Sequence, residues 1–111
     1  MNDSILDTIK QLLGIQSEYT AFDTDIIVHI NSAFMVLNQL GVGPTECFSI
    51  DGSGEEWAEF VDESIDLEAV KTYIYLKVRT IFDPPSSSVV MEAMNKNISE
   101  LEWRLNVQVE K

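Results

Sequence analysis

Residues 67 to 82 read LEAVKTYIYLKVRTIF and carry a strong helical pattern. Apolar side chains recur there at the spacing of one helix face and then spread around it: Leu67, Val70, Ile74, Val78 and Ile81, widened by Ala69, Tyr73 and Leu76. We expect Asp66 to cap this helix. The helix must end near Phe82, because Asp83 precedes Pro84-Pro85 and a residue before proline is pushed out of the helical region. The predicted helix is apolar around most of its circumference.

Two further helices are predicted before this one. Residues 4 to 13 form an amphipathic helix that Gly14 ends, with the stripe Ile5, Leu6, Ile9, Leu12 and Leu13. Asp23 is expected to cap the second helix, which Gly41-Val42-Gly43-Pro44 stops. Its stripe runs through Ile26, Ile27, Ile30, Ala33, Phe34, Leu37 and Leu40, with Thr24, Asn31 and Asn38 on the opposite face.

A fourth helix is predicted after the prolines. Ser86, Ser87 or Ser88 caps it, and its stripe is Val90, Met94, Ile98, Leu101 and Leu105. Glu92 with Lys96, and Glu100 with Arg104, are acid-before-base pairs on its outer side. The last residues are ambiguous, since Leu105, Val107 and Val109 alternate like a strand while Leu101, Leu105 and Val109 continue the helix. A strand here would have to pair with a neighbouring chain.

The segment from Thr45 to Asp66 is predicted to be a long loop. Residues 47 to 50 could make only a short strand, residues 51 to 54 read as a turn, and residues 55 to 61 could form one or two helical turns. So long a connection suggests a functional surface. The alternative is that Trp57 and Phe60 pin the loop to the core.

These elements predict one all-α domain over residues 1–111, a small bundle of about four helices with a long acidic loop and at most one short strand. The chain has 111 residues, and 45% of them are hydrophobic, which fits a soluble globular domain. The sequence has no run of about 18 apolar residues, and Met1-Asn2-Asp3 is acidic, so we expect neither a membrane helix nor a signal peptide and expect the cytoplasm. Cys47 is the single cysteine, which excludes internal disulfides.

Charge is distributed unevenly along the chain. The formal net charge is −12; residues 1–65 hold twelve acids and one base, Lys10, whereas residues 66–111 hold seven acids and six bases. This balance disfavours binding to a phosphate backbone, which needs clustered Lys and Arg. An acidic run is also compatible with a solvated surface that maintains solubility.

No catalytic, cofactor or metal site is predicted. A nucleophile pair could only be Cys47 with His29, and neighbours on its own helix explain His29 without catalysis. Asp51, Ser53, Glu55, Glu59 and Asp62 imitate a calcium loop, but the glycine of its sixth position is replaced by Glu56. No glycine-rich phosphate loop occurs.

Four blocks of the sequence carry a family likeness. FDTDIIVHINSAF from Phe22, LNQLGVGP from Leu37, AVKTYIYLKVRTIFDPP from Ala69 and LEWRLN from Leu101 together resemble the head-tail connector, or adaptor, proteins of phages and prophages of low-GC Gram-positive bacteria. The resemblance implies a helical subunit without catalytic residues that self-associates into a ring beneath the portal vertex. It also implies a location at the head-tail junction of the virion, after assembly in the host cytoplasm.

The implied partners are the portal protein above and a stopper or tail-completion protein below. The segments expected to dock them are residues 102–111, as an extended tail, and the loop of residues 45–62. The ring would extend the channel through which DNA passes without specific binding. An acidic wall suits such a channel because it repels phosphate within about 8 Å. The acids expected at the lumen or in the docking loop are Asp51, Glu55, Glu56, Glu59, Asp62 and Glu63.

A ring needs apolar surface beyond the core of each subunit. The candidates for portal or subunit contacts are Tyr73, Tyr75, Leu76, Trp103, Arg104, Val107 and Val109. The alternative for the aromatic residues is that they complete the core of the monomer. The alternative function is a small acidic inhibitor that mimics DNA and occupies a nucleic-acid-binding protein. An enzyme that uses His29 and Cys47 comes third.

Overall fold

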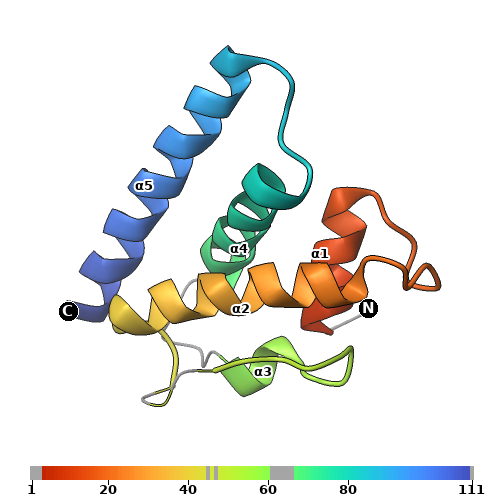
Figure 1. Cartoon of the computed structure of the whole chain (residues 1–111). Helices are drawn as coiled ribbons and strands as arrows, with labels where there is room; N and C mark the ends of the chain where they lie inside the picture. Colours follow the sequence, from red (N-terminus) through yellow and green to blue (C-terminus); the bar gives the residue numbers. More distant parts are fainter. Residues whose placement is uncertain (1–3, 45, 47, 61–66, 111) are drawn as a thin grey trace.

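The computed structural model describes residues 4–44, 46, 48–60 and 67–110. These residues form five helices (Figure 1): α1 (Ile5–Leu13), α2 (Asp23–Gln39), α3 (Trp57–Phe60), α4 (Leu67–Phe82) and α5 (Ser88–Glu110). The predicted all-α class is confirmed. The described residues contain no strand and only an isolated bridge between Ser4 and Glu56, so the candidate strand is not seen at residues 48–50. Cys47, Val61 and Asp66, the expected cap, lie outside the described residues.

Helix α4 lies at the centre of the molecule. Helix α2 crosses it and makes the most extensive contact, while α5 and α1 pack on either side (Figure 1). The wide apolar stripe is confirmed because Val70, Tyr73, Ile74, Leu76 and Val78 are buried. The prediction for Ile81 is wrong. Its side chain is 57% exposed, because it lies in the last turn of α4, where the neighbouring residues are only partly covered.

Helix α1 begins and ends as expected, but Lys10 is buried on it in place of Leu12. The Oγ atom of Ser4 accepts a hydrogen bond from the amide of Asp7 at 3.3 Å, and Gly14 adopts the left-handed conformation, with φ +83°, that ends a helix. Leu12 was expected inside but is 48% exposed, whereas Lys10 is 1% exposed. The reason is that the connection from α1 to α2 folds back over the Lys10 side of the helix, as its hydrogen bonds to Lys10 show.

Helix α2 buries its predicted stripe but is not capped as predicted. Its most deeply buried side chains are Ile26, Ile30, Ala33, Phe34 and Leu37. The capping position is Phe22, with no side-chain hydrogen bond, and Asp23 lies in the first turn. The carboxylate of Asp23 pairs instead with the ammonium of Lys10, at 2.7 Å. Asn31 was predicted to lie on the polar face. Its side-chain amide instead bonds to the loop: it accepts from the backbone N–H of Ile50 at 2.8 Å and donates to the carbonyl of Ile50 at 2.9 Å.

The loop before α4 is pinned to the core by aromatic rings, as the alternative for Trp57 and Phe60 proposed. The rings of Phe34, Phe48 and Phe60 contact one another with centroids 4.6 to 5.4 Å apart. Trp57 is buried, and its indole N–H donates to the hydroxyl of Thr8 on α1 at 3.1 Å. The described part of the loop therefore forms a layer beneath α1 and α2 (Figure 1).

Helix α5 is long, and its described side chains are buried only at Ile98 and Leu105. The Oγ atom of Ser87, one of the three expected caps, accepts from the amide of Val90 at 3.3 Å. Ile98 and Leu105 are buried as predicted, but Val90 is 47% exposed, because the first turns project beyond the other helices (Figure 1). The strand alternative for the last residues is wrong, since the helix continues to Glu110. Residues 102–110 are therefore helical rather than an extended tail.

Candidate assembly surfaces

The acidic loop presents its carboxylates on the outside of the molecule. Asp51, Glu56 and Glu59 are exposed and Glu55 is half-buried, while Asp62 and Glu63 lie outside the described residues. The loop is fixed because the amide of Ile5 donates to the carbonyl of Glu55 at 3.0 Å, and Trp57 is buried behind it. The structure therefore holds four of the six predicted acids in one defined surface segment.

Asp51 and Glu55 influence each other's protonation. The amide of Asp51 donates to Oε2 of Glu55 at 3.1 Å. Burial alone would raise the pKa of Glu55, but hydrogen bonds from the backbone and side chain of Asp51 lower it overall. The pKa of Asp51 is raised by its side-chain hydrogen bond to Glu55 and then by the charge of that carboxylate. At acidic pH this pair thus favours an ionised Glu55 beside a protonated Asp51.

The predicted interface residues of α4 are largely inside the chain. Tyr73 is fully buried and Leu76 is 9% exposed, so the core alternative describes them. The hydroxyl of Tyr73 donates to Oε2 of Glu102 at 2.7 Å and links α4 to α5. Burial, with the carboxylate of Glu102, raises the pKa of Tyr73 far above its ordinary value, so the hydroxyl keeps its proton. Tyr75 is half-buried, and its hydroxyl accepts from Arg79 at 3.0 Å.

The predicted interface residues of α5 remain accessible. Trp103 is 67% exposed, which is unusual for so large an apolar side chain. Arg104 is exposed and pairs with Glu100 at 2.6 Å, as predicted, and Val107 is half-buried. The side chain of Val109 lies outside the described residues. Arg104 also borders a groove of about 280 Å³ between α4 and α5, lined by Thr72, Leu76, Asn97, Glu100, Leu101 and Arg104.

The buried ammonium of Lys10 is a feature that the sequence analysis missed. Its Nζ atom donates to the carbonyls of Ser17 and Tyr19, at 3.1 and 2.8 Å, and contacts Asp23 at 2.7 Å. Two hydrogen bonds and one ion pair thus surround the ammonium, which allows a charge to be buried. The one available signal was that Lys10 is the single base among the first 65 residues.

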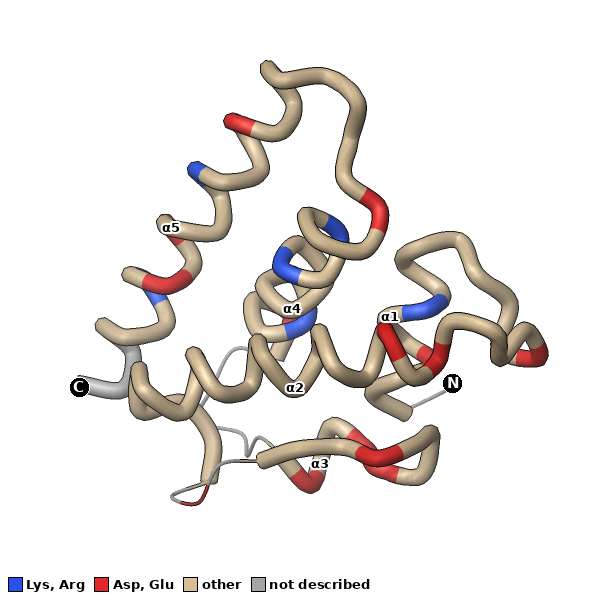
Figure 2. The backbone as a smooth tube through the Cα atoms, viewed as in Figure 1, with Lys and Arg blue, Asp and Glu red and all other residues tan. Residues whose placement is uncertain are grey.

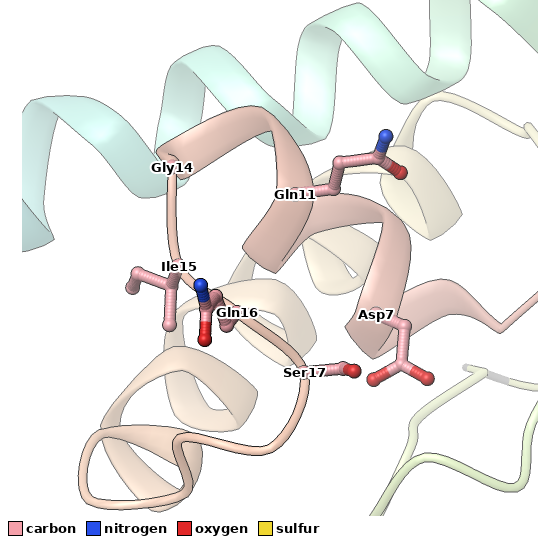
Figure 3. A pocket seen from close by; sticks show the side chains of 6 residues that line it. All are labelled: Asp7, Gln11, Gly14, Ile15, Gln16 and Ser17. Atoms are coloured by element: carbon pink, nitrogen blue, oxygen red, sulfur yellow. The ribbon is translucent and has the colours of Figure 1, made fainter.

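Lys10 also shapes the connection from α1 to α2, where a shallow pocket of about 340 Å³ lies (Figure 3). Asp7 and Ser17 point into it from opposite sides (Figure 3). Its lining consists of Asp7, Gln11, Gly14, Ile15, Gln16 and Ser17. Asp7 is the single charged residue of this lining, so the pocket offers no set of converging charged groups.

The structure separates the charges of the chain. Figure 2 shows that, among the described residues, the bases other than Lys10 lie on α4 and α5 together with several acids, while acids predominate around the α1–α2 connection and α3. Because Lys10 is buried, the exposed surface of the described residues before α4 carries acids and no Lys or Arg. That surface is therefore suited to repel phosphate.

The described residues show no arrangement typical of a catalytic or metal centre. They contain no group of three or more His, Cys, Asp or Glu side chains that could hold a metal ion. His29 is half-buried on α2, and its proposed partner Cys47 lies outside the described residues. Among the helices described, none is both long and apolar enough to cross a membrane.

The exposed tryptophan of α5 and the acidic loop are surfaces of the kind through which proteins contact one another. The chain belongs to the phage connector protein family, since the model of that family, described as "Phage connector protein", matches residues 5–111. Searches of the curated proteins and of the solved structures found no match. Membership assigns the chain a structural role in phage assembly, at the head-tail junction and in contact with other head or tail proteins.

Proposed function

We propose that this chain is a connector subunit that forms a ring between the portal vertex and the stopper or tail-completion protein, and that the ring extends the DNA channel. The family match over residues 5–111 carries the proposal. The exposed Trp103 on α5 supports it, because tryptophan is enriched where proteins bind one another. Docking through residues 102–111 and through the loop of residues 45–62 belongs to the same proposal.

The acidic loop suits the lumen or its rim. DNA must traverse such a channel without being held, and a surface with more exposed carboxylates than bases repels phosphate within about 8 Å at physiological salt. Asp51, Glu56 and Glu59 are the exposed acids of the described loop. A map of the ring in which all three lie on its outer circumference would contradict this placement.

Electron microscopy of the purified chain mixed with the portal protein of the same phage tests the ring. The proposal predicts an additional ring of density on one face of the portal, absent when the chain is left out. Portal rings that remain bare at all protein ratios would contradict it.

A DNA mimic is the second candidate, because the buried Lys10 leaves the acids before α4 without an exposed base. A mimic binds a basic protein with an affinity that falls steeply as salt rises, and it does not assemble on a portal. Tight, salt-sensitive binding to a DNA-binding protein together with bare portal rings would favour this function.

A further inference from the structure

We propose that the projecting first turn of α5 from one copy packs on the outward face of α2 in the next copy, so that these two surfaces form the contact between neighbours in the ring. The inference rests on the proposed function, and it specifies where the subunits meet. The first surface, called the α5 tip, consists of residues 84–91. The second, called the α2 face, consists of Val28, Ser32, Met35 and Gln39.

The α5 tip carries two valines that the described residues leave largely uncovered. Val89 is 73% exposed and Val90 is 47% exposed. The tip reads PPSSSVVM, without Asp, Glu, Lys or Arg. Figure 1 shows that it stands at the far end of α5, away from α2 and α3. The described chain therefore leaves these side chains uncovered.

The α2 face is a second uncovered surface, and it lacks charge for an unusual length. Val28 and Met35 are each 56% exposed, and Ser32 and Gln39 lie exposed on the same side at helical spacing. Residues 26–40 contain no Asp, Glu, Lys or Arg, although 23% of the chain is charged. The exposed side of a helix is ordinarily its most charged side, so this face has the composition of a contact surface.

Electrostatics favours a second copy as the occupant. Each copy carries a net charge of −12, so two copies repel each other unless they meet where acids are absent. The α5 tip, between Asp83 and Glu92, and the α2 face, which begins three residues after Asp25, contain no acids themselves, and apolar side chains are exposed on both.

The shapes suit a ring. A closed ring requires two different surfaces on each subunit, one meeting the other on the next copy. The tip is a narrow projection and the α2 face is a broad helix side, and they lie on different parts of the molecule (Figure 1). The end of one helix on the side of another buries less than the ~800 Å² per partner of a standard interface. We therefore expect this contact to form on the portal rather than in free solution.

Cysteine cross-linking of the portal-mounted ring tests the contact. Cys47→Ala removes the single native cysteine, and Met35→Cys with Val90→Cys then places one thiol on each surface. A short bismaleimide is expected to produce a ladder of covalent multimers from this chain. An equal mixture of the two single-cysteine chains is expected to give cross-linked dimers and no larger multimers, because each chain has one thiol. The control pairs Gln11→Cys, on exposed α1 surface, with Val90→Cys, and should give no ladder.

The outcomes separate this inference from the proposed function. If microscopy shows a ring but cross-linking gives no ladder of multimers, the inference is wrong and the proposed function stands. If either single-cysteine chain alone gives dimers, the inference is wrong because the contact is symmetric. The absence of any ring overturns both. As a second measurement, Met35→Glu and Val90→Glu should each lower ring occupancy by about tenfold, because a carboxylate is desolvated in the contact. Gln11→Glu should not lower it, and all three variants should melt like the parent chain.

Discussion

A single buried ammonium holds the N-terminal third of the molecule together. Lys10 donates hydrogen bonds to two carbonyls of the connection and forms an ion pair with Asp23, and thereby ties α1, the connection and α2 to one another. Periodicity placed Leu12 rather than Lys10 inside, because a helical pattern does not reveal where a later loop will fold back. Lys10 thus shows which information the sequence lacked, namely the path of residues 15–22.

Replacing Lys10 by methionine should destabilise the fold strongly. The substitution leaves the Asp23 carboxylate and two carbonyls without their donor, and breaking a buried pair in this way costs about 3 kcal/mol. Urea unfolding followed by circular dichroism measures the change. The control is Lys96→Met on exposed α5, expected within about 0.5 kcal/mol of the parent. If Lys10→Met matched that control, the ammonium would not have the role described.

The Asp51–Glu55 pair predicts a pH effect whose sign follows from the directions of the shifts. The lowered pKa of Glu55 means that its contribution to stability is present at neutral pH and is lost as the pH falls below the ordinary glutamate pKa and through the lowered one. The raised pKa of Asp51 acts in the opposite sense, so ionised Asp51 weakens the loop at neutral pH.

Carboxyl NMR titration measures this coupling directly. Glu55→Gln removes the carboxylate that raises the pKa of Asp51 through a hydrogen bond and then through its charge, so that pKa should fall toward its ordinary value. Glu59→Gln is the matched control, because Glu59 bonds the amide of Glu56 and not Asp51. An unchanged Asp51 titration in Glu55→Gln would show that the two groups do not interact.

At the scale of elements, the four long helices could be predicted from the sequence because each has an apolar stripe of helical period, and α1, α2 and α4 are followed by glycine or proline. The stripes could not show which of their residues are buried by neighbouring helices. Ile81 and Val90 continue their stripes but lie where no neighbouring helix reaches them, and Tyr73 lies off its stripe but is buried. These differences depend on how the helices cross, which no local pattern records.

The loop before α4 depends on one glycine for its attachment. Gly43 has φ +90°, and a Cβ atom there would lie 2.5 Å from the ring of Phe60. Gly43→Ala should therefore lower the free energy of unfolding by about 2 kcal/mol, from backbone strain and the displaced ring. Thermal melts check this. Gly52→Ala, where nothing lies within 4 Å, is the control, and equal melting of both variants would refute the close packing.

Trp103 lies on the outer side of α5. Because its side chain is 67% exposed, Trp103→Ala should change folding stability by only about 0.5 kcal/mol. Loss of a tryptophan from an interface costs about 2 kcal/mol, or roughly thirtyfold in affinity, so assembly on the portal should weaken far more. Titration of labelled portal compares the two losses. Tyr19→Ala, another exposed aromatic, should bind like the parent, and a Trp103→Ala chain that does the same would contradict the interface role.

At the scale of the whole molecule, the charge pattern and the fold agree with a structural role in a phage particle. The separation of acids from bases could be predicted from the sequence, because the first 65 residues hold one base. That this base is buried, and that the first turn of α5 and the outer side of α2 are both uncharged and uncovered, required the structure. Composition alone predicted an acidic chain, and packing shows which of its surfaces are free for contact.

The most direct test of the connector role is electron microscopy of particles from a phage whose gene for this chain is disrupted. The account predicts filled heads and separate tails that fail to join, with joining restored when the intact chain is supplied. Complete infectious virions formed in its absence would contradict the account.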